Sequence, residues 1–364
     1  MHDDSLQTLS TPPLPFREPP AQAGAPVPDR RVLAAAIEPF KAPCPRRSAF
    51  QFASTFLAFA ALDAAMYACL GVSVWLTLAL AIPAGGLTVR LFIVQHDCGH
   101  GSFFRSRRLN DLLGRFCSAI TFTPYAFWRR QHANHHACFN NLDRREPGLD
   151  VYSTCTTLRE YQAFSPLRRL LCRVHHHPVM TQLVFPPLIF LVLYRFPFEA
   201  PSSWTRERAS VHLTNAALAG VLGAMMLLLG VWPVLLVQVP IIAVASIIGV
   251  WLFSVQHRFE ETLWMRQERW TPVHASLEGS SYLKLPRVLQ WFTGNIGFHH
   301  VHHLAARVPN YRLQECHEAR PDLMGGVVTL TLWQALLAPC FALWDEDRER
   351  MVPFPRRGRR AVAA

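Results

Sequence analysis

The decapeptide QHDCGHGSFF, residues 95–104, follows directly on a long apolar stretch that occupies residues 50–94. This stretch is long enough for two membrane crossings, because one helical crossing needs about 20 predominantly apolar residues. Residues 71–73 mark a turn between the two crossings, so the sequence predicts a transmembrane helical hairpin. His96 and His100 then lie where the second helix leaves the membrane, and their spacing of four places both imidazoles on one helical face.

Nine histidines form a pattern that is typical of a metal site. They comprise an HxxxH at His96 and His100, an HxxHH at His132, His135 and His136, a second HxxHH at His299, His302 and His303, and the single His257. Spacings of three and four favour one helical face, so we expect each cluster to aim its imidazoles at one point. Neutral imidazole is the commonest metal-binding side chain. Nine rings exceed the roughly four ligands that one zinc ion accepts. The count therefore predicts two octahedral-type metal ions, each with four or five imidazoles and an open position.

Three further apolar stretches lie between the second cluster and His257. Residues 211–231 and 234–253 are separated by a Trp-Pro pair and predict a second transmembrane hairpin. The third apolar stretch, residues 179–194, is shorter than the other two, and two adjacent prolines interrupt it. If all clusters serve one site, the chain crosses the membrane an even number of times in this interval. We therefore expect residues 179–194 to be interfacial or re-entrant.

Composition agrees with an all-α integral membrane protein. Of the 364 residues, 51% are hydrophobic and only 17% are charged. The formal net charge is +11, and its arginines flank the apolar stretches, which favours a membrane surface over nucleic acid as the partner. Nine cysteines without a CxxC pair indicate a reducing, cytosol-facing environment rather than a disulfide framework. We predict four transmembrane helices in two hairpins, an interfacial or re-entrant helix, and a cytosolic helical cap that carries a histidine-rich di-metal site.

The distribution of basic residues predicts the orientation in the membrane. The two expected hairpin turns carry no Lys or Arg, whereas residues 96–178 carry twelve. Because basic residues accumulate on the cytosolic side, both termini and every histidine cluster are expected there, in a bacterial inner membrane or an ER-type membrane.

The two ends of the chain differ in composition from its middle. Residues 1–46 hold ten prolines and are expected to be a disordered or loosely extended tail. Residues 346–364 form a basic tail, and residues 47–345 form the membrane domain between them. The apolar run at residues 329–343 is expected to be helical and to lie at the membrane surface or pack on the body.

Several residues near the clusters allow two interpretations. Asp97, Asn134 and Asn295 are candidates to support the metal ligands, and Asn295, four residues before His299, is expected on the same helical face, where it can bind metal through a water. Asp63 lies inside the first span, where it is either functional or held by a structural partner. Cys98 and Cys138 are expected to pack rather than to ligate, His300 to support the ligands or lie at the surface, and the run His175–His177 to form an interfacial, partly charged turn. The aromatic residues Tyr125, Phe127 and Trp128 are expected to pack rather than to line a substrate channel.

At these clusters the chain resembles the membrane-bound fatty acid desaturases, and in particular the acyl-lipid, Δ12/omega-6-like branch. The resemblance rests on QHDCGHGSFF (95–104), TPYAFWRRQHANHH (123–136), VQHRFE (255–260) and GNIGFHHVHHLAARVPNYRL (294–313). It extends over residues 50–340, and the three histidine boxes in this order are highly specific. The segment NNLDRREPGLDVY (140–152) departs from the expected pattern, with Pro147 where a small residue would suit.

The resemblance implies an O2-dependent di-iron enzyme. It assigns metal ligation to the nine clustered histidines, including His257, and a water-bridged position to Asn295. It implies that two hydrogens are removed from neighbouring methylenes of a membrane-lipid acyl chain, which leaves a cis double bond. No fused haem-binding module is visible, so electrons are expected from a separate ferredoxin or cytochrome b5-like donor, for which the Arg-rich cytosolic face is a docking surface.

Two other functions compete with desaturation. A hydroxylase or ketolase that acts on an acyl chain, an alkane or a carotenoid would carry the same boxes. A histidine-rich metal transporter would need ionisable residues near mid-bilayer on several helices. The predicted spans offer little beyond Asp63, and their histidines lie at the ends, so the sequence favours the enzyme.

Overall fold

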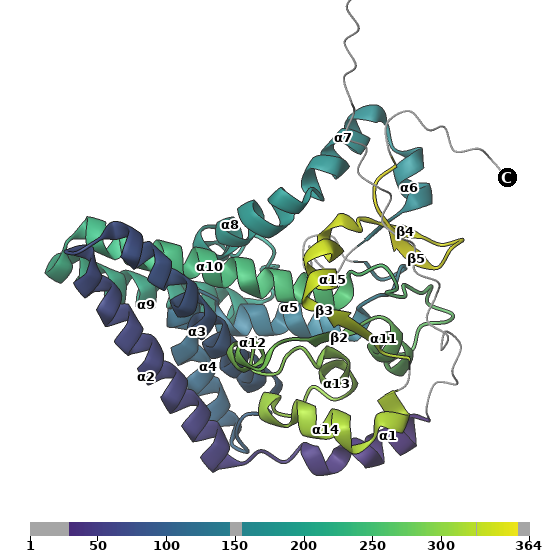
Figure 1. The fold of residues 1–364 in the computed structure, drawn as a ribbon, viewed down its shortest axis with the longest axis horizontal. Helices are drawn as coiled ribbons and strands as arrows, with labels where there is room; N and C mark the ends of the chain where they lie inside the picture. The colour runs from purple at the N-terminus through teal and green to yellow at the C-terminus, as the bar shows by residue number, and fades with distance from the viewer. Residues whose placement is uncertain (1–28, 146–154, 325, 356–364) are drawn as a thin grey trace, which may run out of the picture.

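The computed structural model describes residues 29–145, 155–324 and 326–355. Its longest elements are four apolar helices, each long enough to cross a membrane: α2 (Pro45–Leu70), α3 (Val74–His100), α9 (Thr205–Leu229) and α10 (Val231–His257). Tight turns join α2 to α3 and α9 to α10, so the helices form two hairpins (Figure 1). The predicted number and pairing of the membrane helices is confirmed.

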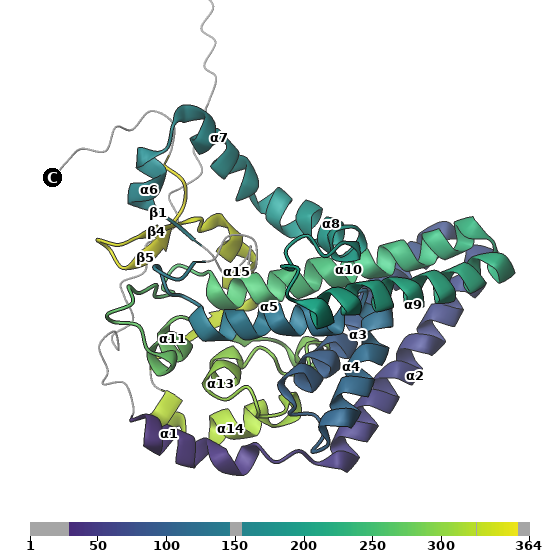
Figure 2. The ribbon, with the colours of Figure 1, turned by 180° about the vertical axis from the view of Figure 1, so that it is seen from behind.

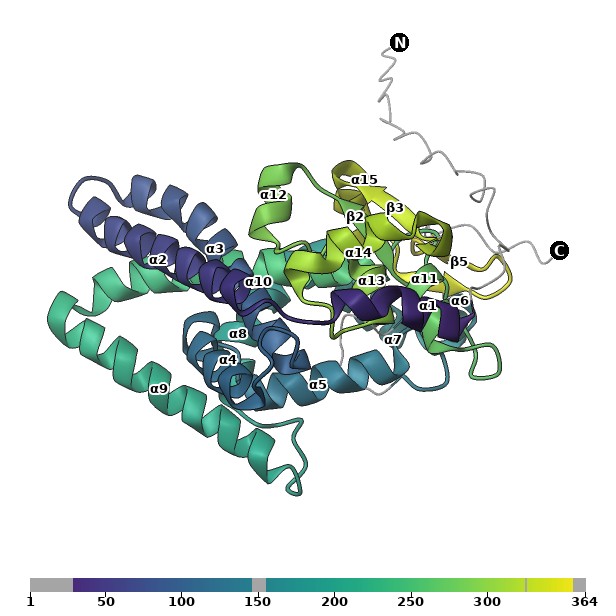
Figure 3. The same ribbon diagram turned by 90° about the horizontal axis from the view of Figure 1, so that it is seen from below.

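Helices α3 and α10 form the centre of the membrane layer, with α2 and α9 on its outside (Figure 3). The close approach of the central pair depends on glycine. A Cβ atom on Gly85 of α3 would lie only 2.6 Å from Cγ1 of Val244 on α10. Gly86 allows a second close approach, outside this pair, because a Cβ atom there would lie 2.8 Å from Cδ1 of Phe292. Only 17% of the apolar window of each of α2 and α9 is buried, as expected for helices whose outer faces contact lipid.

The segment between the hairpins is bent. α7 (Pro166–His175) meets a second helical run at 47°. That run comprises a π-helical turn, η2 (Met180–Val184), then α8 (Phe185–Leu191) and η3 (Leu193–Arg195). Its prolines lie in the first turn of α8, where the missing N–H groups cost least. A bent pair of this kind is either a broken span or a re-entrant loop, so the interfacial or re-entrant placement of residues 179–194 stays a prediction. α8 packs along α10.

A second layer, which we call the cap, lies beyond the histidine-bearing ends of α3 and α10 (Figures 1 and 2). Its helical elements are α5 (Tyr125–Cys138), α6 (Leu158–Ala163), α11 (Pro272–Glu278), α12 (Arg287–Phe292), α13 (His299–Leu304), η4 (Asn310–Arg312), α14 (Leu313–Ala319), η5 (Pro321–Met324), α15 (Leu332–Leu337) and η6 (Ala338–Cys340). Between α3 and α5 the chain forms α4 (Arg107–Thr121). The largest buried apolar cluster joins α3 and α10 to this cap, so the two layers share one core.

Two small sheets interrupt the otherwise helical cap. β2 (Ser281–Lys284) pairs in parallel with β3 (Val328–Thr331). β4 (Leu343–Asp345) lies between the parallel β1 (Thr156–Thr157) and the antiparallel β5 (Arg350–Val352). The prediction of one helix over residues 329–343 is therefore wrong: the run begins as strand β3, and a capping box at Thr331 starts the short α15.

Both expected tails are shorter than predicted. Residues 30–40 form α1 (Arg30–Ile37) and η1 (Glu38–Phe40), and Leu33 and Ile37 are buried in the main apolar cluster. The proline content predicted an extended tail, but the prolines lie before and after α1 rather than inside it. At the other end, β5 belongs to a sheet of the cap, so the basic tail does not begin at residue 346. Residues 1–28 and 356–364, together with Pro147, lie outside the described residues.

Candidate metal centre

Local structure fixes the four segments that carry the clustered histidines. α3 ends at His100 because Gly101 takes a left-handed conformation (φ 69°), which favours glycine. α10 ends at His257. α13 is held next to α10 because Gln256 Nε2 donates to the carbonyl of Ile296 at 2.9 Å, and next to β2 because the amide of Leu283 donates to the carbonyl of Gly297.

The first group of imidazoles comes from α3, α5 and α13. Nε2 of His96 lies 3.0 Å from Nε2 of His132 and 3.1 Å from Nε2 of His302. The ring of His100 lies 4.7 to 4.9 Å from the rings of these three histidines. Its own Nε2 is buried without a hydrogen-bond partner among the described residues. Together these four residues can hold one metal ion.

The second group comes from α5, α10 and α13. Nε2 of His257 lies 2.8 Å from Nε2 of His299 and 3.1 Å from those of His135 and His303. Nε2 of His303 also lies 3.0 Å from that of His299. All four residues are buried. They form a second set that can hold a metal ion, and the lone His257 is at its centre.

His136 lies between the two groups. Its Nε2 is 3.1 Å from Nε2 of His132 and 3.0 Å from Nε2 of His302, both in the first group. Its ring stacks on that of His303 in the second group, with centroids 4.3 Å apart. The nine clustered histidines thus converge on one region, with five nitrogens around the first group and four around the second.

Each HxxHH box is divided between the groups, which differs from the expectation that one cluster aims at one point. His132 and His136 join the first group, while His135 joins the second; His299 and His303 join the second, while His302 joins the first. Residues four apart on a helix differ by about 40° in direction, but a residue three along points about 60° to the other side. The spacing of four therefore keeps ligands together, and the spacing of three separates them.

Burial favours the neutral form of five of these imidazoles. On α5 and α13 the pKa values of His132, His136, His299, His302 and His303 all lie well below the ordinary value of 6.5, first because the rings are desolvated and then because neighbouring imidazoles oppose a second charge. A neutral imidazole has a free lone pair on one ring nitrogen, which is the form that binds metal. These five rings are therefore in the protonation state that metal binding requires.

The nitrogen geometry fits metal ions better than a hydrogen-bond network. One neutral imidazole donates one hydrogen bond, yet Nε2 of His257 has three imidazole nitrogens within 3.1 Å. Two nitrogens at about 2.1 Å from a metal lie about 3.0 Å apart at a right angle and about 3.4 Å apart in a tetrahedron. Of the five close Nε2 separations in the second group, four are 2.8 to 3.1 Å, nearer to the right-angle value, and one is 3.3 Å, nearer to the tetrahedral value.

The predicted supporting residues have different outcomes. Asp97 is buried; one carboxylate oxygen lies 3.2 Å from Nδ1 of His96, and the other accepts the backbone and side-chain amides of Asn310 at 2.7 and 2.8 Å. Asn295 precedes α13 with a positive φ of 60°, so the expectation that it shares a helical face with His299 is wrong. Its amide instead donates to the carbonyl of Asn310 and accepts from Gln290. Sequence alone did not single out Asn310, which links these contacts.

Most of the other residues near the clusters pack as expected. His300 points away from both groups and contacts Nδ1 of His317 at 2.9 Å. The Cys98 thiol lies in an apolar cluster, and Cys138 donates to the carbonyl of Asn134. Neither cysteine belongs to the two groups.

The half-buried acidic residue of the first span also has a partner. Asp63 accepts a hydrogen bond of 2.8 Å from the side-chain amide of Gln238 on α10. The same amide donates to the hydroxyl of Tyr67 at 3.1 Å. This cluster joins the two hairpins, and the structure favours the structural interpretation of Asp63.

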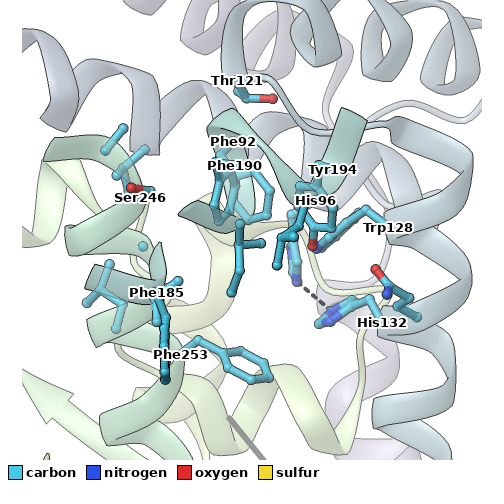
Figure 4. A pocket seen from close by; sticks show the side chains of 18 of the residues that line it. Phe92, His96, Thr121, Trp128, His132, Phe185, Phe190, Tyr194, Ser246 and Phe253 are labelled. Atoms are coloured by element: carbon cyan, nitrogen blue, oxygen red, sulfur yellow. Dashed lines mark hydrogen bonds between the residues drawn. The ribbon is translucent and has the colours of Figure 1, made fainter. Parts of the chain in front are cut away.

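A cavity of about 490 Å³ connects the membrane layer to the histidines. Both groups contribute to its wall, through His96, His132, His135 and His299. Its α10 side runs from Ile242 to Gln256, which corresponds to about 21 Å of helix. Most other lining residues are apolar, and several are labelled in Figure 4.

Aromatic side chains shape the end of this cavity near the imidazoles (Figure 4). Trp128 stacks on His132 with centroids 4.8 Å apart, and Phe253 contacts His135 at 4.9 Å. Phe127 and Trp128 line the cavity, so the expectation that they only pack is wrong for these two. Tyr125 is buried in an apolar cluster, as expected. A long apolar cavity that ends at two histidine groups can hold a chain-like apolar molecule beside metal ions.

Comparison with known protein families identifies enzymes whose function suits such a cavity. A family model described as fatty acid desaturase matches residues 73–333, which include all three boxes and His257. The chain belongs to the fatty acid desaturase family. This desaturase is therefore an oxidoreductase, and the transporter hypothesis is not supported.

Named relatives of the desaturase come from bacteria, cyanobacteria and plants. A fatty acid desaturase of Bacillus subtilis (strain 168) is 41% identical over 325 residues, which are 89% of this chain and 91% of the relative. An sn-1 acyl-lipid omega-3 desaturase (ferredoxin) of Synechocystis is 27% identical and covers 71% of this chain and 72% of its own. A chloroplastic omega-6 fatty acid desaturase of Arabidopsis thaliana is 25% identical over 78% of this chain and 63% of its own.

Proposed function

We propose that this desaturase holds two iron ions, one in each histidine group, and uses O2 to introduce a cis double bond into the acyl chain of a membrane lipid. The observation that carries the proposal is the cavity, because a single apolar slot reaches both histidine groups. The balanced reaction takes one O2, two electrons and two protons, and it converts a –CH2–CH2– unit into –CH=CH– with two molecules of water.

The proposed ligands are His96, His100, His132, His136 and His302 for the first ion, and His135, His257, His299 and His303 for the second. Iron suits them because it is redox-active and accepts imidazole. Bound iron would supply the activation of O2 and the removal of hydrogen from an unactivated methylene. We propose that Asp97 fixes the ring orientation of His96 through their 3.2 Å contact. The geometry gives no support for a water-bridged role of Asn295.

The protein's own contribution is to position the chain and exclude water. Trp128 and Phe253 lie against the imidazoles at the cavity end, so a bound methylene there is surrounded by apolar and aromatic carbon. Deeper in the membrane layer, Ile242, Ala245 and Val250 line the same slot. A fixed position of the chain along this slot selects which pair of carbons meets the metal ions.

We also propose the orientation and the electron donor. The turns of both hairpins lack basic residues, whereas the histidine-bearing ends are rich in arginine, so the positive-inside rule places the cap and both termini in the cytosol. Relatives named as ferredoxin-dependent desaturases favour ferredoxin as the donor over a cytochrome b5-like protein.

One expression experiment tests the reaction. The chain is produced in a bacterial host that lacks polyunsaturated lipids, and the fatty acids are profiled by gas chromatography with location of the double bonds. We expect a new cis-unsaturated product together with about two iron ions per chain by metal analysis. The His135→Ala variant loses product and iron together, whereas His274→Ala on the cap surface, where that residue pairs with Glu278, retains both. A hydroxylated or oxo product, or normal iron and turnover in His135→Ala, contradicts the proposal.

A further inference from the structure

Helix α4 carries an apolar stripe that is not buried in the protein. Leu109, Leu112 and Phe116 are 51%, 68% and 45% exposed. Their spacings of three and four place them on one face of α4. In a soluble protein such a stripe would be buried in a core, so here it indicates contact with an apolar phase outside the chain.

The opposite face of α4 is fixed to the body. The side chain of Asn110 makes hydrogen bonds to both the amide and the carbonyl of Phe104. Gly114 lies so close to the Tyr125 ring that a Cβ atom would be 2.3 Å from Cε2. The helix therefore cannot rotate to bury its leucines without losing these contacts.

The stripe continues the lipid-facing surface of a spanning helix. Phe116 makes edge-to-face contacts with Phe52 and Phe56 of α2, with centroids 5.9 and 5.3 Å apart. Figure 2 shows α4 beside the part of α2 and α3 nearest the cap. The apolar face of α4 thus lies at the level where the membrane layer meets the cap.

Four arginines accompany this stripe: Arg105, Arg107, Arg108 and Arg115. All four side chains are exposed, and within the described ranges none of their guanidinium groups forms an ion pair or a hydrogen bond. Arg108 and Arg115 are seven residues apart, or about two turns, so they lie on one edge of the helix beside the leucines. Unpaired guanidinium groups at the rim of an apolar stripe fit phosphate groups at a membrane surface.

Helix α7 repeats the pattern on another part of the molecule. Leu167, Leu170 and Leu171 are 66%, 46% and 60% exposed. Arg168 is exposed beside them and lies over the Phe164 ring at 3.9 Å. Two separate helices therefore present leucines and arginines together.

We propose that α4 and α7 lie in the headgroup region of the bilayer and bind anionic phospholipid, with leucines among the acyl chains and arginines on the phosphates. An acidic protein partner would suit the arginines, but it would have to cover the leucines next to a spanning helix. A leaflet of anionic lipid satisfies both at once. This inference concerns the lipid environment and is independent of the reaction proposed above.

Lipid selectivity tests the inference. The full chain is reconstituted in nanodiscs of phosphatidylcholine with a minor fraction of spin-labelled phosphatidylglycerol or spin-labelled phosphatidylcholine, and the protein-bound fraction of each label is measured. We expect a several-fold preference for phosphatidylglycerol, which falls as salt is added. Replacing Arg105, Arg107, Arg108 and Arg115 by Gln should reduce the preference to near that for phosphatidylcholine.

Two matched variants separate this effect from net charge and from misfolding. The first variant removes the same charge elsewhere and should leave the preference for phosphatidylglycerol unchanged. It replaces by Gln four arginines that pair with carboxylates on the cap: Arg159, Arg269, Arg320 and Arg348. The second variant replaces Arg105, Arg107, Arg108 and Arg115 by Lys and should retain the preference for phosphatidylglycerol. An α4 Gln variant that folds and keeps the full lipid preference overturns the inference, and loss of ferredoxin-supported turnover in that variant would then assign the surface to a protein partner.

Discussion

Gly249 offers a direct way to test what the cavity holds. This residue lies on α10 in the cavity wall, between the imidazole end and the deeper residues Ser246 and Ile242. A Cβ atom at Gly249 would meet nothing within 4 Å, so a larger side chain can enter the cavity without moving the backbone. Gly249→Leu therefore fills part of the slot while the histidine groups remain intact.

The expected size of the effect follows from the volume of the new side chain. Leucine adds four carbons, which displace about four methylenes of a bound acyl chain. At about 0.8 kcal/mol for each buried methylene the loss is roughly 3 kcal/mol. That corresponds to about a 100-fold fall in kcat/KM for a substrate that reaches the deep end. A substrate about four carbons shorter should lose much less.

The assay measures product formation on acyl substrates of graded length, with iron content determined on the same samples. Gly249→Ala adds one carbon and should cost only about fourfold. Gly220→Leu is the matched control, because Gly220 is also open but is exposed on α9. Full activity of Gly249→Leu on the longest substrate would show that the chain does not occupy this cavity. Loss of iron would show that the substitution disturbs the metal groups instead.

Three further predictions follow from the site and its supports. Asp97→Asn should lower iron affinity about 10–100-fold, measured by competition with a chelator, because the carboxylate orients a ligand ring; unchanged affinity would remove Asp97 from the site. The imidazoles of His132, His136, His299, His302 and His303 have lowered pKa values in the folded protein, so their neutral form favours folding and metal retention above the ordinary pKa of about 6.5. Both should decline as the pH falls below that value, in titrations of bound iron and thermal stability, and equal retention at pH 5 and pH 7 would refute the argument. Gly114→Ala should destabilise the protein by about 1–3 kcal/mol in thermal unfolding, because its Cβ atom overlaps the Tyr125 ring; a neutral result would mean that the ring relaxes.

Local features of the chain were enough to predict the membrane helices. Length and hydropathy define α2, α3, α9 and α10, because a crossing requires an uninterrupted apolar segment of nearly fixed length. The same local reasoning was wrong at α1, where prolines surround a short helix that packs into the core. It was also wrong at residues 329–343, because pairing of β3 with β2 overrides the local preference for helix.

The sequence by itself determined the chemistry of the site: nine histidines at the membrane boundary, in boxes whose spacing suits a helix. Only the tertiary structure decided how they are shared. His132 and His135 are close neighbours on α5, yet they belong to different groups. Each group is completed by rings from α10 or α3 that are more than 30 residues away in the chain. Helical periodicity sets the direction of each ring, but the packing of α3, α5, α10 and α13 decides where those directions meet.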